Sequence, residues 1–259
     1  MPKIALLVRY PVKGMSGIPI PLAELKTGEA FALDRAYAIE NGARRFDPQN
    51  PKWLSKISFL QLMQHPRLAS LTLSFEEAGH LLKLSRAGKQ VAKGALETKL
   101  GRQMIEQFLA AYLGADLRGP PRIVSAAGHS FSDIAEKALH IVNLESVRDL
   151  GRMAAAELDP RRFRANVYIE GLPAWDEREW RGRIISCGDA KLKVIAETGR
   201  CEAISVDPVS TLRGVSLPAI IERTWGHRNL GFYAKVVADG AAAIGANINV
   251  LGPLAGEVS

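Results

Sequence analysis

Short apolar segments alternate with turn residues along most of the chain, which contains 23 glycines and 14 prolines among its 259 residues. Segments this short fit strands better than helices. In residues 68–75, Leu71, Leu73 and Phe75 alternate with polar neighbours, as expected for a strand with one buried face. Many short strands joined by turns are typical of β-barrels. We therefore predict a mainly β fold with helices, in the α+β class.

The strands that we predict cover much of the chain on both sides of one helical segment. They are residues 4–9, 35–39, 68–75, 81–84, 123–126, 139–144, 166–169, 182–185, 191–196, 202–206, 233–238 and 246–251. The helical segment, about residues 90–113, is predicted from apolar residues at roughly helical spacing. These residues are Ala95, Leu96, Leu100, Met104, Phe108 and Tyr112. Two further short helices are predicted at residues 147–150, where Ser146 is a possible N-cap, and at 154–158.

The clearest break in the chain is Gly119-Pro120-Pro121. Glycine next to proline is a strong turn signal and interrupts both helices and strands. We therefore predict two domains. Residues 1–118 form an N-terminal β-barrel domain that includes the helical segment, and residues 119–259 form a second barrel domain.

The charge balance favours an anionic ligand, because 34 basic and 27 acidic residues give a net charge of +7. The basic residues are spread along the chain without clustered aromatic residues, so we expect no nucleic-acid partner. The apolar run at residues 4–8 is shorter than a signal-peptide core, and no segment has the length and apolarity of a membrane span. Two cysteines, Cys187 and Cys201, form no disulfide framework. We therefore expect a cytoplasmic protein without membrane association.

Several common catalytic and binding motifs are missing from the sequence. It contains no phosphate-binding loop of the GxxxxGK[ST] type, no CxxC, no HExxH and no GxSxG. The five histidines show no zinc-ligand spacing. His140 lies in an apolar run, so we interpret it as a core or interface residue. The cysteines and the basic residues remain as candidates for a functional site.

Four short segments carry the strongest functional signal. They are Tyr10-Pro11-Val12-Lys13-Gly14 with Asp34-Arg35-Ala36-Tyr37; Phe131-Ser132-Asp133 with Ile-Val-Asn-Leu-Glu-Ser-Val at 141–147; Phe163-Arg164-Ala165-Asn166-Val167; and Thr198-Gly199-Arg200-Cys201 with Val206-Asp207-Pro208. In this order they resemble the MOSC family, whose name comes from the carboxy-terminal domain of the molybdenum cofactor sulfurase. The first half resembles the companion N-terminal MOSC β-barrel domain. The arrangement is similar to that of the mitochondrial amidoxime-reducing component and its bacterial relatives.

The resemblance implies a molybdenum–molybdopterin cofactor between the two domains, with the nucleotide extension of the pterin left open. In the family, the cysteine of the Arg-Cys pair is the thiolate ligand of molybdenum. Here this residue is Cys201, which is thus the predicted catalytic and metal-binding residue. A soft thiolate suits this metal, and a cation such as Arg200 favours the deprotonated thiol. The alternative interpretation of Cys201 is a small buried apolar residue, and Cys187 matches no functional position.

The cofactor carries a phosphate, and Lys13, Arg35 and Arg164 match the basic contacts of the family. Arginine suits phosphate because its planar guanidinium can bond two oxygens. Gly14 stands where close relatives often have a serine, so the resemblance leaves only a backbone contact at that position. Each basic residue taken alone is also compatible with a solvated surface position.

Three polar residues complete the predicted site. Ser146 is expected to donate its hydroxyl at a helix start, where free backbone N–H groups favour an anion. Asn143 and Asn166 are expected to hydrogen bond the edge of the pterin, because each amide has two donors and an acceptor. For Ser146 a helix-capping role is the alternative.

The resemblance leads to a functional hypothesis and an alternative. The first is a molybdenum-dependent reductase of N-hydroxylated or N-oxygenated small molecules, with electrons from a separate electron-transfer protein. The alternative is a sulfur carrier or sulfurtransferase that uses a Cys201 persulfide, or a carrier of the molybdenum cofactor. A thiol that carries sulfur needs to be exposed and reactive, so the environment of Cys201 bears on both hypotheses. A third hypothesis, a β-barrel that binds another anion, remains as a less specific interpretation of the charge.

Overall fold

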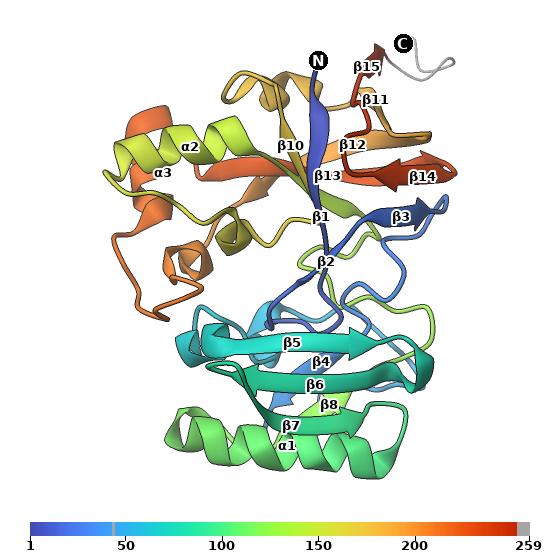
Figure 1. Cartoon of the computed structure of the whole chain (residues 1–259), viewed down its shortest axis with the longest axis vertical. Coiled ribbons are helices and arrows are strands. Elements are labelled where there is room, and N and C mark those ends of the chain that lie inside the picture. The colour runs from blue at the N-terminus through green and yellow to red at the C-terminus, as the bar shows by residue number, and fades with distance from the viewer. Residues whose placement is uncertain (43–44, 253–259) are drawn as a thin grey trace.

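The computed structural model describes residues 1–42 and 45–252, which form two halves stacked along the long axis (Figure 1). The upper half contains a large sheet flanked by the helices α2 (Leu144–Met153) and α3 (Leu217–Trp225). The lower half contains a three-stranded sheet and α1 (Lys99–Leu113). The α+β fold class is confirmed. Within the described residues, none of the helices has the length and apolarity needed to cross a membrane.

Eight strands form the sheet of the upper half, in the order β15-β11-β12-β13-β9-β10-β1-β2. All neighbouring pairs are antiparallel except β9 with β10. The strands are β1 (Lys3–Arg9), β2 (Ile18–Ile20), β9 (Leu139–Asn143), β10 (Val167–Glu170), β11 (Ile184–Cys187), β12 (Ala190–Gly199), β13 (Asn229–Ala238) and β15 (Val250–Gly252). A two-stranded ribbon of β3 (Leu22–Leu25) and β14 (Gly240–Ala243) lies beside this sheet.

The segment that leads into β15 joins the two sides of this sheet. The Ile4 N–H donates to the Ala246 carbonyl over 2.9 Å, and the Ser186 N–H donates to the Asn249 carbonyl over 2.8 Å. Residues 246–249 thus bond to β1 on one side and to β11 on the other. Because β1 and β11 lie near opposite ends of the strand order, these bonds close the sheet into a barrel. The inner core includes Leu7, Ile141 and Leu192.

The lower half packs α1 against short sheets. β5 (Leu71–Glu76), β6 (Leu81–Arg86) and β7 (Lys89–Ala95) form one sheet, and β4 (Ala38–Asn41) pairs with β8 (Pro121–Val124). Thr98 caps α1 by accepting a hydrogen bond from the Gly101 N–H over 3.0 Å. Ile105, Leu109 and Leu113 are buried against the sheets. This burial of one helical face holds α1 in place.

Several sequence predictions need correction. Residues 90–95 belong to β7, so only the second part of the predicted helical segment is helical. Leu100 and Met104 lie on the exposed side of α1, although the spacing had included them in its apolar face. Residues 202–205 form a 3-10 turn rather than a strand, and residues 154–158 are not helical. The spacing rules missed α3, whose pattern is interrupted by Pro218 at its first turn.

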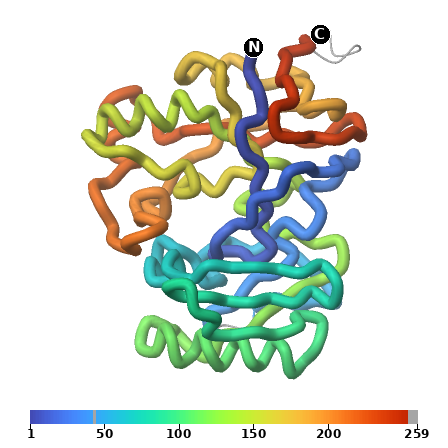
Figure 2. The backbone as a smooth tube through the Cα atoms, in the orientation of Figure 1, coloured from blue at the N-terminus to red at the C-terminus, as the bar shows by residue number. Residues whose placement is uncertain are grey.

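The candidate site depends on three of the segments that connect the halves. β1 lies in the upper barrel, and the chain then descends through Tyr10–Gly14 into the lower half (Figure 2). The residues around Arg35 run alongside, since the Arg35 N–H donates to the Tyr10 carbonyl over 2.7 Å. The third connection, residues 125–138, joins β8 to β9, and the Phe131 N–H donates to the Arg35 carbonyl over 2.8 Å. Hydrogen bonds thus hold together motifs that lie far apart in the sequence.

Candidate functional site

A cavity of about 360 Å³ lies at the junction of the two halves. It contains seven of the predicted site residues: Lys13, Gly14, Arg35, Arg164, Asn166, Arg200 and Cys201. Six cationic residues line it, against three carboxylates. The cations are Lys13, Arg35, Lys56, Arg162, Arg164 and Arg200, and the carboxylates are Asp34, Asp133 and Glu197. The excess of positive charge makes the cavity suitable for an anionic ligand.

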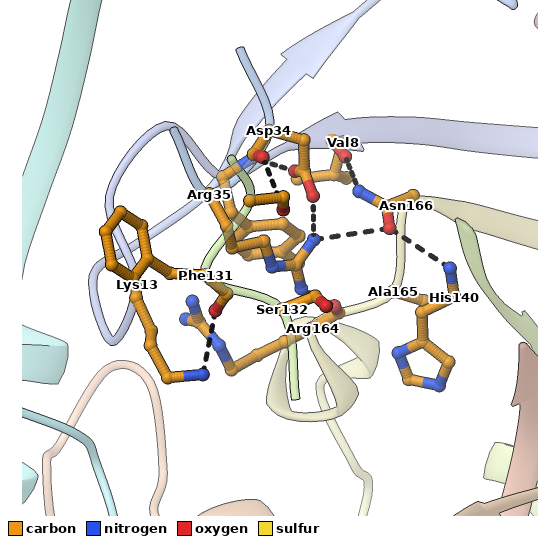
Figure 3. Close-up of polar contacts among 12 residues, drawn as sticks. Val8, Lys13, Asp34, Arg35, Phe131, Ser132, His140, Arg164, Ala165 and Asn166 are labelled. Carbon is orange, nitrogen blue, oxygen red and sulfur yellow. Dashed lines mark hydrogen bonds and ion pairs between the residues drawn. The ribbon is translucent and has the colours of Figure 1, made fainter. Parts of the chain in front are cut away.

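Arg35 is fixed by hydrogen bonds to protein groups on several elements. Its Nη1 donates to Asp34 Oδ2 over 2.5 Å and to Asn166 Oδ1 over 3.2 Å, and its Nη2 donates to the Arg164 carbonyl over 2.9 Å (Figure 3). Burial disfavours the charged guanidinium, but the Asp34 carboxylate outweighs this and raises the pKa of Arg35. Arg35 therefore presents a rigid permanent positive charge at the junction.

Arg35 and Arg164 both stack on Tyr10. Each guanidinium carbon lies 4.5 Å from the centroid of the Tyr10 ring, which is itself buried. Both arginines have left-handed backbone conformations, with φ of 50° at Arg35 and 54° at Arg164. Such conformations are unfavourable for residues other than glycine and concentrate at functional sites. Burial lowers the pKa of Arg164, and its Nη1 donates to the Met15 carbonyl over 2.6 Å.

Lys13 lies on the descending segment and points toward residues 131–133. Its Nζ donates to the Phe131 carbonyl over 2.9 Å and to Asp133 Oδ1 over 2.5 Å. Burial lowers the pKa of Lys13, although Asp133 partly offsets this effect. Gly14 follows with φ of 81°, and a Cβ there would lie 2.4 Å from the Leu60 carbonyl oxygen. A serine at this position thus conflicts with the neighbouring backbone, which explains the departure from the family pattern.

Arg200 is held by a set of acceptors deep in the upper half. Its Nε donates to the Leu230 carbonyl over 2.8 Å, its Nη1 to the Phe163 carbonyl over 3.2 Å, and its Nη2 to His140 Nε2 over 2.8 Å. A guanidinium can only donate, so His140 Nε2 accepts and the imidazole is neutral. Burial, reinforced by Arg200, lowers the pKa of His140 well below its ordinary value. Burial also lowers the pKa of Arg200 to about 10.

The two cysteines have different environments. Cys201 begins the 3-10 turn Glu202–Ser205, lines the cavity and is partly exposed. Cys187 is fully buried in the core of the barrel, and burial raises the pKa of its thiol to about 12. A buried neutral thiol is inert, whereas a partly exposed thiol in a cationic cavity is available as a ligand or nucleophile.

Two predicted residues, Asn143 and Ser146, lie outside the cavity. Asn143 is the N-cap of α2, and its side chain also donates to Glu177 Oε2 over 2.9 Å. Ser146 is therefore not an N-cap. Its hydroxyl donates to Glu177 Oε1 over 2.6 Å and accepts from the Trp175 N–H over 2.9 Å. Both side chains are committed to a buried structural network.

Asn166 lines the cavity, but its amide is occupied by protein partners. Its Oδ1 accepts from Arg35 Nη1 and, over 3.1 Å, from the His140 N–H. Its Nδ2 donates to the Val8 carbonyl over 3.2 Å. Asn166 therefore positions Arg35 and joins β1 to β9, instead of presenting its amide to a ligand as predicted.

Sequence reasoning missed three cavity residues that have buried polar atoms without a hydrogen-bond partner: Gln61 Nε2, Arg162 Nε and Thr198 Oγ1. Buried polar atoms are nearly always bonded, so unpartnered ones on residues that line a cavity are suited to bond a ligand or water there. Of these three residues, only Thr198 belongs to one of the sequence motifs. Gln61 lies in no motif, and it reaches the cavity because the fold packs its backbone against Gly14. The residues of the cavity thus fit an anionic ligand that also has hydrogen-bonding groups.

The chemical character of the cavity agrees with a phosphate-bearing, sulfur-ligated group. Its basic side chains match a phosphate, and the Cys201 sulfur is a soft donor for a transition metal. Within residues 1–42 and 45–252, no three histidine, cysteine or carboxylate side chains are grouped as metal ligands. The donor set is therefore one thiol next to several cations.

The fold and the site together define a two-part β protein with a cationic, cysteine-containing cavity between its parts. Residues 119–249 match the MOSC domain family, and residues 1–119 match the MOSC N-terminal beta barrel domain family. The chain therefore belongs to the MOSC family, and the predicted resemblance is confirmed. MOSC domains are associated with molybdenum cofactor binding in general.

Similar solved structures include three bacterial proteins. The YUAD protein from Bacillus subtilis is 13% identical over 96% of both chains, with a TM-score of 0.46. YiiM from Geobacillus stearothermophilus is 21% identical over 47% of this chain and 57% of its own, with a TM-score of 0.37. YiiM from Escherichia coli is 19% identical over 45% and 55%, with a TM-score of 0.35. The matched part is thus little more than half the length of either YiiM chain. No curated protein matches the chain.

Proposed function

We propose that this protein is a molybdenum-cofactor-binding oxidoreductase that reduces N-hydroxylated or other N-oxygenated small molecules. The observation that carries the proposal is the junction cavity, where Cys201 lies among buried cations. Conversion of an N-hydroxylated compound to the amine consumes two electrons and two protons and releases water. We assign the electrons to a separate electron-transfer protein.

The residues of this chain have distinct roles in the proposal. Lys13, Arg35 and Arg164 would hold the phosphate of the pterin, whether or not the phosphate carries a nucleotide. Cys201 would ligate the metal through its thiolate. When bound, the cofactor supplies the redox chemistry of oxygen removal. The rigid pairing of Arg35 with Asp34 fixes the position of the phosphate without a reorganisation cost during turnover.

Arg200 would act as a fixed cation that interacts electrostatically with Cys201. Its guanidinium is anchored at both the Leu230 carbonyl and His140 Nε2, so the charge stays next to Cys201. A fixed cation stabilises a thiolate more than a mobile one, because no conformational freedom is lost on ligation. The neutral state of His140 keeps a second positive charge away from Arg200.

The first experiment compares molybdenum content in protein made in a host that supplies the cofactor. We expect near-stoichiometric metal in the wild type and a large loss in Cys201→Ala. Cys187→Ala is the matched control and should retain metal, because Cys187 lies in the core away from the cavity. Reduction of benzamidoxime with reduced methyl viologen as donor should follow the same order. Wild-type reductase activity that persists in Cys201→Ala would contradict the proposed role of the thiolate.

The sulfur-carrier alternative is distinguished in the same samples. Cys201 is partly exposed in a cationic cavity, which also suits a persulfide anion. A carrier would show the added mass of one sulfur atom on Cys201 by mass spectrometry. Such an adduct, together with the absence of molybdenum in the wild type despite cofactor supply, would favour this alternative over the reductase.

A further inference from the structure

The two asparagines predicted to recognise the uncharged part of the ligand make most of their hydrogen bonds to the protein. Asn143 is bonded to Glu177 outside the cavity, and Asn166 uses its amide on Arg35, Val8 and His140. Each amide has two N–H groups and one carbonyl oxygen, so Asn166 keeps at most one N–H for a ligand. Further hydrogen-bonding groups for a ligand must therefore come from other residues.

Gln61 is one such residue and comes from the lower half. It lines the cavity, its side chain is more than nine-tenths buried, and its Nε2 has no hydrogen-bond partner within residues 1–42 and 45–252. The backbone of Leu60 and Gln61 packs directly against Gly14, where an added Cβ would lie 3.3 Å from the Gln61 Cα. This close approach places Gln61 beside the Lys13–Gly14 turn, next to one of the cavity cations.

Thr198 is the second such residue and comes from the upper half. It lies near the end of β12, three positions before Cys201, and it is 3% exposed. It lines the same cavity, and its Oγ1 has no hydrogen-bond partner in the part of the chain that the structure describes. A buried hydroxyl or amide without a partner costs free energy, so two such groups on residues that line one cavity from opposite halves are a paired signal.

We infer that Gln61 and Thr198 recognise the uncharged hydrogen-bonding edge of the ligand, namely the amide and amine groups of a pterin-like heterocycle. The inference rests on the proposed function, in which the cavity holds a pterin. Gln61 donates through Nε2 to a ring nitrogen or carbonyl oxygen. Thr198 donates or accepts through its hydroxyl. Because the two residues come from different halves, a ligand that contacts both joins the halves through neutral groups as well as through its phosphate.

The cations and the two neutral residues are expected to contribute differently to ligand affinity. The cations attract the anionic group of any ligand, whereas Gln61 and Thr198 distinguish a heterocycle with matching groups from a simple anion. Replacing an unpartnered buried polar group with an apolar group of similar shape removes its desolvation cost in the free protein. The two residues should therefore affect affinity for pterins and should not support the stability of the ligand-free protein.

The test uses Gln61→Met and Thr198→Val, which keep shape and remove hydrogen bonding. Two probes are titrated against the ligand-free full chain, namely fluorescent pterin-6-carboxylate and inorganic pyrophosphate. We expect each substitution to weaken pterin-6-carboxylate binding about tenfold, with pyrophosphate affinity and thermal stability unchanged or slightly higher. Gln64→Met is the matched control, because Gln64 lies on the same turn but does not line the cavity. It should leave both affinities unchanged.

The outcomes separate this inference from the proposed function. If the wild type binds pterin-6-carboxylate and both variants bind it equally well, the assignment of Gln61 and Thr198 is overturned while the pterin site stands. If the wild type binds pyrophosphate but not pterin-6-carboxylate, the proposed function and the inference fall together. If both variants lower thermal stability without changing affinity, the two groups serve the fold through ordered water, and the inference is wrong.

Discussion

Two buried polar clusters lie in this molecule, and they differ in how completely their groups are bonded. The cluster formed by Asn143, Ser146 and Glu177 covers each donor and acceptor with a protein partner. The cavity cluster consists of the polar residues that line the junction cavity. It holds like charges close together and, among the described residues, leaves Gln61 Nε2 and Thr198 Oγ1 without partners. Both clusters contain residues that the sequence selected as ligand contacts.

The comparison teaches that burial of polar residues alone does not indicate function. A satisfied network such as that of Glu177 stabilises one arrangement of α2 and the turn at Asp176–Trp180. The cavity cluster is instead locally unfavourable, with strained backbone at Arg35 and Arg164 and an excess of positive charge. Such local costs persist when a ligand compensates them. The cluster that we propose to be functional is thus the one that the fold leaves incomplete.

The largest effect that we predict is on the structural cluster. Glu177→Leu should lower the free energy of unfolding by about 3 kcal/mol, because Asn143 Nδ2 and Ser146 Oγ lose a buried acceptor. Chemical denaturation measures the loss. Affinity for pyrophosphate should not change, since none of these residues lines the cavity.

The exposed neighbour Glu179 provides the control for this prediction, and Glu179→Ala should change stability by less than about 0.5 kcal/mol. A Glu177→Leu protein that is as stable as the wild type would remove the distinction between the two clusters.

The second prediction concerns the cavity, where a substitution should change ligand affinity and leave stability almost unchanged. Lys13→Met should weaken pyrophosphate binding about tenfold, because it removes one of the buried cations. The free energy of unfolding should change by less than about 1 kcal/mol, because burial already disfavours the charged lysine. In addition, the Asp133 side chain is 56% exposed, so it stays solvated after the lysine is removed. Isothermal titration calorimetry and thermal unfolding give the two values.

Lys52→Met serves as the control for Lys13→Met, since Lys52 is exposed and does not line the cavity. Equal affinities of Lys13→Met and the wild type would mean that the cations do not act as an anion site.

The sequence predicted the fold class and most strands, because alternation and turn residues are local signals. It failed where tertiary contacts decide. Residues 90–95 lay within the predicted helical segment but pair with β6, and residues 202–205 form a turn instead of a strand. At the candidate site, the sequence motifs were sufficient to identify Lys13, Arg35 and Arg164, because a motif specifies which side chains occur at which positions. The roles of Asn143 and Gln61 depend on which partners the fold supplies, and no local pattern encodes this.

The smallest predicted effect distinguishes the clusters by the sign of their pH dependence. Burial and Arg200 lower the pKa of His140, so below its ordinary value of 6.5 the unfolded chain binds a proton that the folded protein excludes. Stability from this residue therefore falls as pH falls. Burial raises the pKa of Glu177 from 4.5, so above that pH the folded protein retains a proton that the unfolded chain releases. Stability from this residue falls as pH rises.

His140→Gln removes the first titration and keeps a hydrogen-bond acceptor for Arg200. Glu177→Gln removes the second and keeps a polar side chain near Ser146. The slope of unfolding free energy against pH should decrease in His140→Gln below pH 6.5 and increase in Glu177→Gln just above pH 4.5, each by at most about 1.4 kcal/mol per pH unit. Urea denaturation at a series of pH values measures both slopes. Slope changes of the same sign in the two variants would contradict the prediction that His140 and Glu177 have opposite effects on the pH dependence of stability.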